Sequence, residues 1–139
     1  MTKSVLIVED EIFLAIDLER ILEAEGYEVA GIAADSEEAM AAAPKARIAF
    51  VDVNLRDGPT GPRIARALAE QFGMKIVYVT ANPSQIAPPA RDAIGVVQKP
   101  FREETILLAA ALASGESADS LPRADARELV LFDWSTQPA

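Results

Sequence analysis

Short apolar runs recur along the chain, separated by segments in which apolar residues return with a helical period. Four of the runs are clear: Val5–Val8, Ile48–Val51, Ile76–Val79 and Ile94–Val97. A fifth, weaker run begins at Tyr27 in the stretch YEVAGIA. Runs of this length are typical of strands buried on both faces, so the pattern predicts five strands, each followed by a helix.

The first two helices have recognisable ends. The first is expected near residues 11–25, with Gly26 ending it. Its apolar face comprises Leu14, Leu18, Ile21 and Leu22. The second begins at DSEE, where Asp35 and Glu38 have the spacing of a capping box, and is expected to end at Pro44.

The later helices differ in strength. The third opens with TGP, which puts Pro62 in its first turn, and its aligned apolar residues are Ile64, Leu68 and Phe72. The fifth ends before Gly115, and its apolar stripe comprises Thr105, Ile106, Leu107, Leu108 and Leu112. The fourth segment, NPSQIAPPARDA, contains three prolines, and each proline inside a helix costs about 3 kcal/mol. We therefore expect a short, broken or mobile element there.

Strands that alternate with helices indicate a parallel sheet covered on both faces, because crossovers between parallel strands are right-handed. The sequence therefore predicts a three-layer α/β fold. We expect residues 1–115 to form this domain and residues 116–139 to form a linker and an apolar tail segment. The tail stretch ELVLFDWSTQPA has an apolar face in an extended form, so it either covers its own domain or serves in docking or self-association.

Composition excludes several classes of function. The 139 residues suit one domain, and the net charge of −9 argues against a nucleic-acid-binding surface. The chain has no cysteine, which excludes disulfides, thiolate nucleophiles and thiolate zinc sites. It has no histidine, which excludes Ser-His and Cys-His catalysis and a role as phosphohistidine donor. Neither a signal peptide nor a membrane span is recognisable, so we expect a cytoplasmic location.

Charged and hydroxyl side chains follow the strong strands at the point where each strand ends. Glu9 and Asp10 follow the first strand, Asp52 the third, Thr80 the fourth and Lys99 the fifth. Because the carboxyl ends of parallel strands share one edge of the sheet, we expect these side chains to converge.

Three converging acids repel one another unless positive charge is present. Lys99 supplies one charge, and we expect a divalent cation to supply the rest. Carboxylate oxygens with some retained water suit Mg²⁺. With the charge offset, one carboxylate could attack a phosphoryl group and form an aspartyl phosphate, aligned by groups such as Thr80 and Lys99.

This set of residues resembles the receiver domains of two-component response regulators. The resemblance covers about Ser4 to Ala113, in the expected order and strand context. The matching residues are Glu9-Asp10, Asp52, Thr80-Ala81 and Lys99-Pro100-Phe101. The resemblance implies a flavodoxin-like (βα)5 fold with strand order 2-1-3-4-5. The stretches DVNLRDGPTG and VYVTANP also look like those of alphaproteobacterial receivers, including stand-alone ones.

The same resemblance implies roles for the acidic residues. Asp52 would accept phosphate from the phosphohistidine of a sensor kinase or phosphotransfer protein. Asp10 and Asp52 would bind Mg²⁺ directly, the backbone carbonyl of Asn54 would be a third ligand, and Glu9 would help through water.

The residues after the fourth and fifth strands match the family, with one departure. Lys99 would pair with the phosphoryl oxygens, Thr80 would hydrogen-bond to them, and the small Ala81 would leave room for the phosphoryl group.

Most receivers have Tyr or Phe three positions before the lysine, where this chain has Val96. Tyr78 lies nearby in sequence but on the fourth strand. Our hypothesis is that signalling instead uses order and disorder of the proline-rich fourth segment.

Single residues of this set also fit simpler structural roles. Glu11 suits the first turn of a helix, and Asp57, in the stretch RDGPTG, suits turn chemistry. Thr80 could simply cap the following element, and Lys99 could be a solvated loop lysine.

Taken together, these features predict a single-domain response regulator. We expect it not to be an enzyme but a phosphorylation-dependent protein-interaction switch, or a phosphate shuttle or sink. The expected partners are a sensor histidine kinase or phosphotransfer protein and an unidentified downstream protein, with a homodimer left open and neither nucleic acid nor membrane expected.

Two rival classes of function share parts of this pattern. The alternative is a pseudo-receiver that binds partners without phosphorylation, which Val96 keeps open. A Mg²⁺-dependent phosphatase is disfavoured, because such chemistry wants a second acid two positions after the nucleophile, where Asn54 stands.

Overall fold

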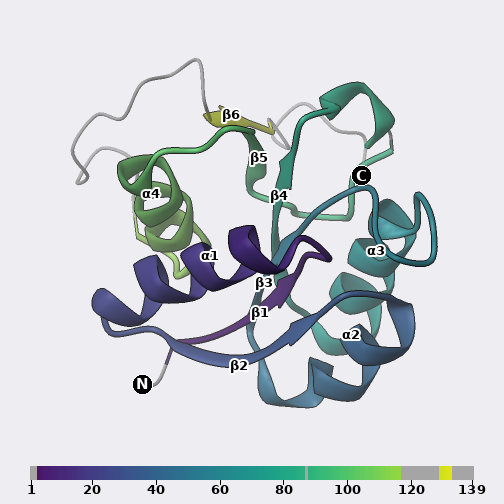
Figure 1. Cartoon of the computed structure of the whole chain (residues 1–139), viewed down its shortest axis with the longest axis horizontal. Helices are drawn as coiled ribbons and strands as arrows, with labels where there is room; N and C mark the ends of the chain where they lie inside the picture. The colour runs from purple at the N-terminus through teal and green to yellow at the C-terminus, as the bar shows by residue number, and fades with distance from the viewer. Residues whose placement is uncertain (1–2, 87, 117–128, 133–139) are drawn as a thin grey trace.

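The computed structural model describes residues 3–86, 88–116 and 129–132. These residues form a six-stranded sheet in the order β2-β1-β3-β4-β5-β6, with helices on both faces (Figure 1). The strands are β1 (Ser4–Val8), β2 (Glu28–Ala33), β3 (Ile48–Val51), β4 (Lys75–Thr80), β5 (Gly95–Gln98) and β6 (Leu129–Leu131). The first five are parallel, so the predicted α/β class and the strand order 2-1-3-4-5 are confirmed.

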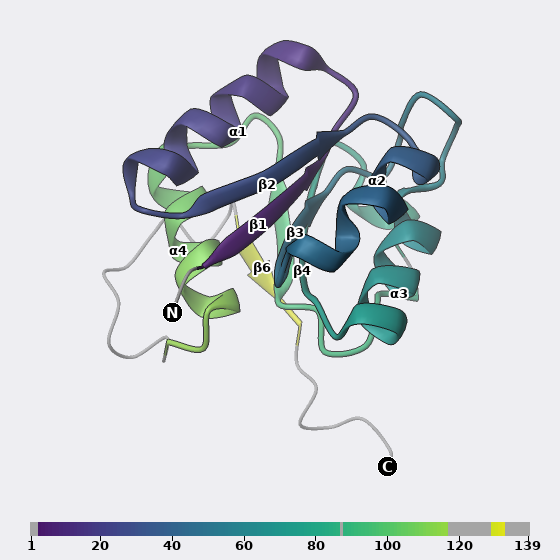
Figure 2. The ribbon, with the colours of Figure 1, turned by 90° about the horizontal axis from the view of Figure 1, so that it is seen from below.

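Two apolar clusters hold the helices against the sheet. Helices α1 (Ile12–Ala24) and α4 (Glu103–Ala113) cover one face, and α2 (Ser36–Ala42) and α3 (Gly61–Phe72) cover the other (Figure 2). The strands between them are almost fully buried, with all four residues of β3 inaccessible to solvent or nearly so. Burial on both faces explains why these strands are continuous apolar runs rather than alternating ones.

The buried faces of α1 and α4 differ in detail from the predicted stripes. In α1 the buried residues are Ala15, Leu18, Ile21 and Leu22, while Leu14 is only half-buried. In α4 the face against the sheet is mostly alanine: Thr105, Ile106, Ala109, Ala110 and Ala113. Leu108 and Leu112 lie to the side and are half-buried. Small residues let a helix approach the sheet closely, so the larger leucines fill the flank instead.

The second helix begins as predicted and ends at Ala42, two residues before the predicted end at Pro44. The Asp35 carboxylate accepts a hydrogen bond from the amide of Glu38 at 2.9 Å. The Glu38 carboxylate accepts one from the amide of Ala34 at 2.8 Å, one residue earlier than in a capping box. After Ala42 the chain tightens into a single 3-10 turn, Ala43–Lys45, which contains Pro44.

The crossover between β4 and β5 contains no α-helix in its described residues. Its regular structure is one 3-10 turn, Pro83–Gln85, so the predicted short element is confirmed. Side chains of Tyr78 and Arg66 help to fasten the later part of this crossover to the rest of the molecule. The Tyr78 hydroxyl accepts a hydrogen bond from the amide of Ala90 at 2.8 Å, and the Arg66 guanidinium donates to the carbonyl of Pro88 at 3.1 Å.

Part of the apolar tail returns to the sheet as β6, which pairs antiparallel with β5. Leu129 is buried, whereas Val130 and Leu131 are 59% and 48% exposed. The ring of Phe132 lies edge-on to that of Tyr78, with 6.1 Å between their centroids. The remaining tail residues, 117–128 and 133–139, lie outside the described part of the chain, and the proposed boundary after residue 115 stays a prediction.

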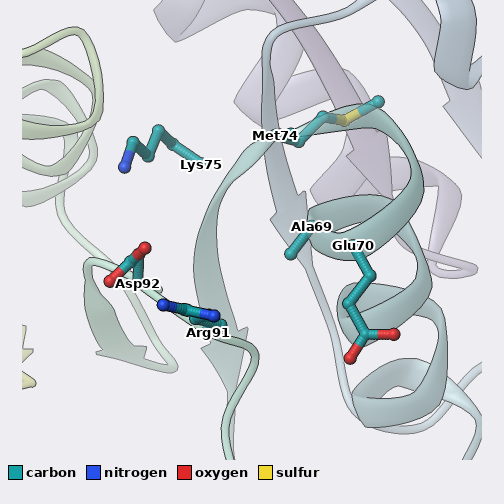
Figure 3. Close-up of a pocket in the computed structure, with 7 residues that line it drawn as sticks. Ala69, Glu70, Met74, Lys75, Arg91 and Asp92 are labelled. Carbon is teal, nitrogen blue, oxygen red and sulfur yellow. The ribbon is translucent and has the colours of Figure 1, made fainter. Parts of the chain in front are cut away.

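A pocket of about 350 Å³ lies at the beginning of β4, between the end of α3 and the loop before β5 (Figure 3). It is lined by Ala69, Glu70, Gly73, Met74, Lys75, Arg91 and Asp92. Lys75 begins β4 and Thr80 ends it, so the pocket lies at the opposite end of the strand from the predicted site.

Candidate functional site

Backbone hydrogen bonds bring the ends of the parallel strands into one group. Beyond β3, the amide of Asp52 donates to the carbonyl of Val8 at 2.9 Å. Beyond β5, the amide of Lys99 donates to the carbonyl of Thr80 at 3.0 Å. These bonds extend the ladders past the strand ends and place the following side chains beside one another.

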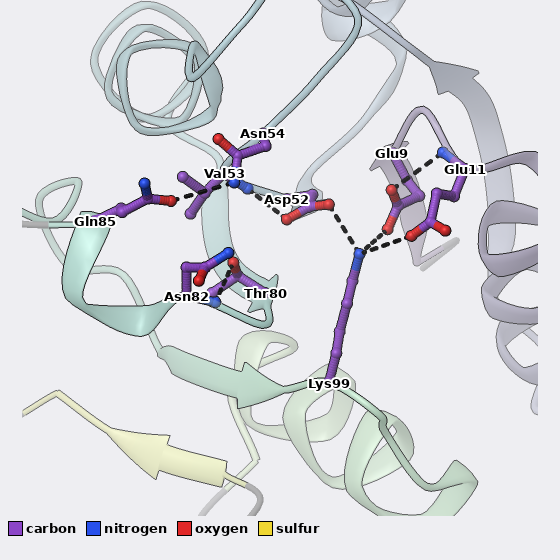
Figure 4. Close-up of polar contacts among 9 residues, drawn as sticks. All are labelled: Glu9, Glu11, Asp52, Val53, Asn54, Thr80, Asn82, Gln85 and Lys99. Atoms are coloured by element: carbon purple, nitrogen blue, oxygen red, sulfur yellow. Dashed lines mark hydrogen bonds and ion pairs between the residues drawn. The ribbon is translucent and has the colours of Figure 1, made fainter.

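The Lys99 ammonium lies at the centre of this group (Figure 4). Its Nζ is 2.7 Å from Oε1 of Glu9, 2.8 Å from Oδ2 of Asp52 and 3.7 Å from Oε2 of Glu11. The other oxygen of Asp52 accepts a hydrogen bond from the amide of Val53 at 2.7 Å. Lys99 is therefore not a solvated loop lysine, because it joins the ends of β1, β3 and β5.

Burial gives these charges unusual protonation equilibria. Burial raises the pKa of Glu9 to about 7, with a contribution from the Asp52 charge and opposition from the Lys99 hydrogen bond. Burial alone would lower the pKa of Lys99, but its hydrogen bonds to Asp52 and Glu9 outweigh that effect and raise it. One ammonium thus faces a surplus of carboxylates, an arrangement that favours a further cation.

The donor atoms suit a magnesium ion. Glu9, Asp10 and Asp52 each offer a carboxylate oxygen, and these oxygens lie within 4.8 Å of one another. Asp10 is exposed while the other two are buried, so the group opens to water on one side. Oxygen donors from a few carboxylates, with room for retained water, are what Mg²⁺ prefers. This acidic triad is typical of the Mg²⁺ site of receiver domains.

The remaining predicted residues surround this centre less directly. Thr80 is fully buried, and its hydroxyl accepts a hydrogen bond from the amide of Asn82 at 3.0 Å. In this structure Thr80 therefore caps the start of the crossover, the simpler of its two expected roles. Ala81 is exposed beside it. Asn54 is exposed, and its side-chain amide donates to Gln85 Oε1 at 3.2 Å.

Asp57 has the structural role expected of it. Its carboxylate accepts hydrogen bonds from the hydroxyls of Thr60 at 2.6 Å and Ser36 at 2.7 Å. It thereby ties the loop after β3 to the first turn of α2.

Gly61 lies against the backbone of Asp52, a contact that could not be identified from the sequence. A Cβ at this position would lie 1.9 Å from the carbonyl oxygen of Asp52 and 2.7 Å from the Cα of Val53. The amide of Gly61 also donates to the carbonyl of Val53 at 2.9 Å. The stretch TGP indicates a helix start, and nothing in it signals that the helix begins against the backbone of Asp52.

Tyr78 is a second residue whose place the sequence leaves open. It pairs across the sheet with Val96, the position at which most receivers have an aromatic residue. Its side chain is fully buried, and burial raises its pKa. An aromatic ring therefore lies on the strand next to Val96, two residues before Thr80.

Known proteins resemble this chain over most of its length. A family model described as "Response regulator receiver domain" matches residues 5–111. The phyllosphere-induced regulator PhyR of Methylorubrum extorquens is 29% identical over 110 aligned positions, covering 76% of this chain and 41% of that protein. The transcriptional regulatory protein PdtaR of Mycobacterium tuberculosis is 33% identical over 145 aligned positions, covering 92% of this chain and 69% of the relative.

Solved structures show the same similarity. The PhyR response regulator REC domain of Erythrobacter litoralis superposes with a TM-score of 0.75 at 28% identity, covering 89% of this chain and 97% of that one. The response regulator PhyR of Brucella abortus superposes with a TM-score of 0.66 at 27% identity, covering 81% of this chain and 47% of that one. The chain thus spans less than half the length of the full PhyR proteins.

In the described residues no helix is long and apolar enough to cross a membrane.

Proposed function

Because the chain belongs to the response regulator receiver domain family, we propose that Asp52 accepts a phosphoryl group and that the chain acts as a phosphorylation-dependent switch. Receiver domains are phosphoacceptor modules served by histidine kinases. The observation that carries the proposal is the convergence of Glu9, Asp10 and Asp52 on one edge of the sheet, with Lys99 bonded to two of them.

These 139 residues contain no histidine, so they cannot themselves supply a phosphohistidine. A carboxylate oxygen of Asp52 attacks the phosphorus of a phosphohistidine. The new O–P bond forms as the N–P bond breaks, and the electron pair of that bond stays on the imidazole nitrogen. A sensor histidine kinase or a phosphotransfer protein would supply the phosphohistidine.

The residues of this chain prepare that transfer by position and charge. Lys99 holds Asp52 through Oδ2 and faces the space in which phosphoryl oxygens would accumulate negative charge. Thr80, at the end of the neighbouring strand, accepts a hydrogen bond from the amide of Asn82 and would donate its hydroxyl hydrogen to the phosphoryl group, and the small Ala81 would leave room.

Asp10, Asp52 and the backbone carbonyl of Asn54 are the proposed direct ligands of Mg²⁺, and Glu9 would take part through water. When bound, the ion neutralises phosphoryl oxygens and the surplus carboxylates. The close approach of the three carboxylate oxygens supports this assignment.

We propose that the phosphorylated form acts by protein contact, as a switch, a shuttle or a sink for phosphate. A stand-alone role and a cytoplasmic location belong to the same proposal. The intact mass of the endogenous protein would test the stand-alone role.

Asp52→Asn tests the phosphoacceptor directly. Wild-type protein incubated with acetyl phosphate and Mg²⁺ is expected to gain one phosphoryl group, measured by intact mass, and to gain none without Mg²⁺. Asp52→Asn is expected to gain none. Asp57→Asn is the matched control, since Asp57 is an exposed aspartate of the same loop, and it should label like the wild type.

Labelling that persists in Asp52→Asn would refute the assignment. If no protein is labelled, the same comparison is repeated with a phosphohistidine donor protein. Failure there too would favour the pseudo-receiver, which binds partners without phosphorylation.

A further inference from the structure

Strand β6 closes the β5 edge of the sheet with only three residues. Leu129 lies opposite Val97, Val130 opposite Val96, and Leu131 opposite Gly95. The amide of Phe132 adds one hydrogen bond to the carbonyl of Ile94 at 3.1 Å. An exposed edge strand offers unpaired N–H and C=O groups to any extended chain that reaches it, and here a short piece of the same chain takes them.

The β5 edge is shaped to receive the backbone of another strand. A Cβ on Gly95 would lie 2.3 Å from the carbonyl oxygen of Val130 and 3.0 Å from the Cα of Leu131. Any side chain at this position would therefore push β6 away. Gly95 is buried although it lies in an outer strand of the parallel sheet, because β6 covers it.

Two side chains, on opposite faces of the sheet, anchor β6. Leu129 joins the apolar cluster under α1 and α4. Phe132, three residues later, packs against the other cluster, edge-on to Tyr78. Between these anchors, Val130 and Leu131 remain 59% and 48% exposed. The contact thus has a simple pattern, an aliphatic anchor followed three positions later by an aromatic one.

We infer that the β5 edge is a strand-addition docking surface for an extended segment of a protein partner, and that β6 occupies this surface in cis. The partner segment would run antiparallel to β5 and carry an aliphatic residue and, three positions later, an aromatic residue. The protein that carries this segment would be the downstream partner of the switch, so the biological role of the docking surface rests on the proposed function.

The small size of the cis contact favours a partner over a second copy. With three paired residues and two anchors, β6 is the least embedded strand of the sheet, so a segment with a longer ladder gains contacts by replacing it. A second copy of the chain would offer the same β6, and exchanging identical strands between copies gains no contact that the cis arrangement lacks.

The docking surface also lies next to the acidic site. Tyr78, which contacts Phe132, is two residues before Thr80 on β4 and accepts the amide hydrogen bond of Ala90. A change at the end of β4 or in the crossover would therefore reach the aromatic anchor through one side chain.

The test measures binding of a labelled peptide with the sequence of residues 127–134, RELVLFDW, to the unphosphorylated full chain without Mg²⁺. In the wild type, the tethered β6 competes at high effective concentration, so fluorescence anisotropy should show weak binding. The variant Leu129→Ala/Phe132→Ala removes both cis anchors and should bind the peptide at least tenfold more tightly. The matched variant Val130→Ala/Leu131→Ala changes exposed residues of the same strand and should bind like the wild type.

Gly95→Ala added to the anchor variant should abolish this binding, because it blocks the edge itself. Equal affinity in all variants, or binding that survives Gly95→Ala, would overturn the inference. Dimerisation of the wild type that is lost in the anchor variant, seen by light scattering without peptide, would also overturn it, by assigning the edge to a second copy.

Hydrogen exchange on the wild type tests the inference without any variant, so the result does not depend on whether a variant folds. The amides of β6 should exchange at least tenfold faster than those of β3, and equal protection would mean that β6 is not displaceable. None of these measurements uses phosphorylation. A failure here therefore leaves Asp52 labelling untouched, and a failure of labelling leaves this test intact.

Discussion

Lys99 has the most connections of any side chain in the acidic site. It bonds to residues that follow β1 and β3, while its own backbone follows β5. A charged pair that is largely buried depends on good geometry to repay its desolvation. The short contacts from Lys99 to Glu9 and Asp52 meet that requirement, and they hold Asp52, the proposed phosphoacceptor, in one orientation.

Gly61 sets the position of the Asp52 backbone. In Gly61→Ala the new methyl would overlap the carbonyl of Asp52, so this segment must move. We expect a loss of about 1–3 kcal/mol in the free energy of unfolding. We also expect slower labelling of Asp52 by acetyl phosphate, measured by intact mass over time.

Gly31→Ala is the matched control for Gly61→Ala. Its methyl would lie 3.3 Å from the side-chain methyl of Ala42, a contact with no backbone atom of the site. Labelling at the wild-type rate in both variants would contradict the positioning role of Gly61.

Asp57 makes stability depend on acid pH. Hydrogen bonds from Thr60 and Ser36 lower its pKa from 3.8 to about 2. Because the folded-state pKa is the lower one, its contribution to stability is complete above about pH 4 and is lost as pH falls toward 2. The difference in urea midpoint between wild type and Asp57→Asn should therefore be largest at pH 6 and shrink below pH 4.

Asp92→Asn changes the charge equally at an exposed aspartate of another loop. It is the control for the removal of one exposed negative charge. If the difference in urea midpoint between wild type and Asp57→Asn stayed constant from pH 6 to below pH 4, the stabilising hydrogen bonds of Asp57 would not depend on the ionisation of its carboxylate.

At the scale of elements, the crossover between β4 and β5 is the least regular connection among the described residues. Prolines prevent a full helix, and the segment is held by Ile86, Ala90, Ala93 and the Tyr78 hydroxyl instead. Phe132, brought in by β6, joins the same apolar cluster. A segment that depends on few contacts can be reordered at low cost in free energy.

We predict that phosphorylation changes amide exchange in residues 82–93. The Thr80 hydroxyl accepts the hydrogen bond from the Asn82 amide that begins the crossover, so turning this hydroxyl to donate to a phosphoryl group would disturb the start of the crossover. Hydrogen exchange with mass spectrometry, with and without acetyl phosphate and Mg²⁺, measures the change. Asp52→Asn is the control for direct effects of the reagents, and identical exchange in both states of the wild type would refute this hypothesis.

At the scale of the whole molecule, one edge of the sheet collects negative charge and so links folding to cation binding. We predict that Mg²⁺ raises the free energy of unfolding, by about 2.7 kcal/mol at a concentration 100 times its Kd. Urea titrations with and without Mg²⁺ measure it. Asp10→Asn and Asp52→Asn should lose this stabilisation, and Asp57→Asn should keep it. Equal stabilisation of all four proteins would place the ion elsewhere.

Much of the fold and the centre of the site could be predicted from local patterns. Each buried strand is a continuous apolar run, and each run is followed by the polar residues that its end must present. The less accurate predictions concern side chains whose burial depends on a neighbour. Leu108 and Leu112 are aligned in α4, yet the alanines of that helix face the sheet.

The sequence by itself determined that five strands alternate with helical segments in a parallel sheet, and that Glu9, Asp10, Asp52 and Lys99 meet at one edge. These features depend on periodicity and on strand direction, which neighbouring residues encode. Only the tertiary structure decided that Lys99 bonds to Glu9 and Asp52, that Gly61 must lack a side chain, and that β6 covers β5 with Phe132 against Tyr78. The physical reason is that such contacts join residues distant in sequence, and they exist only once packing has fixed the distances between elements.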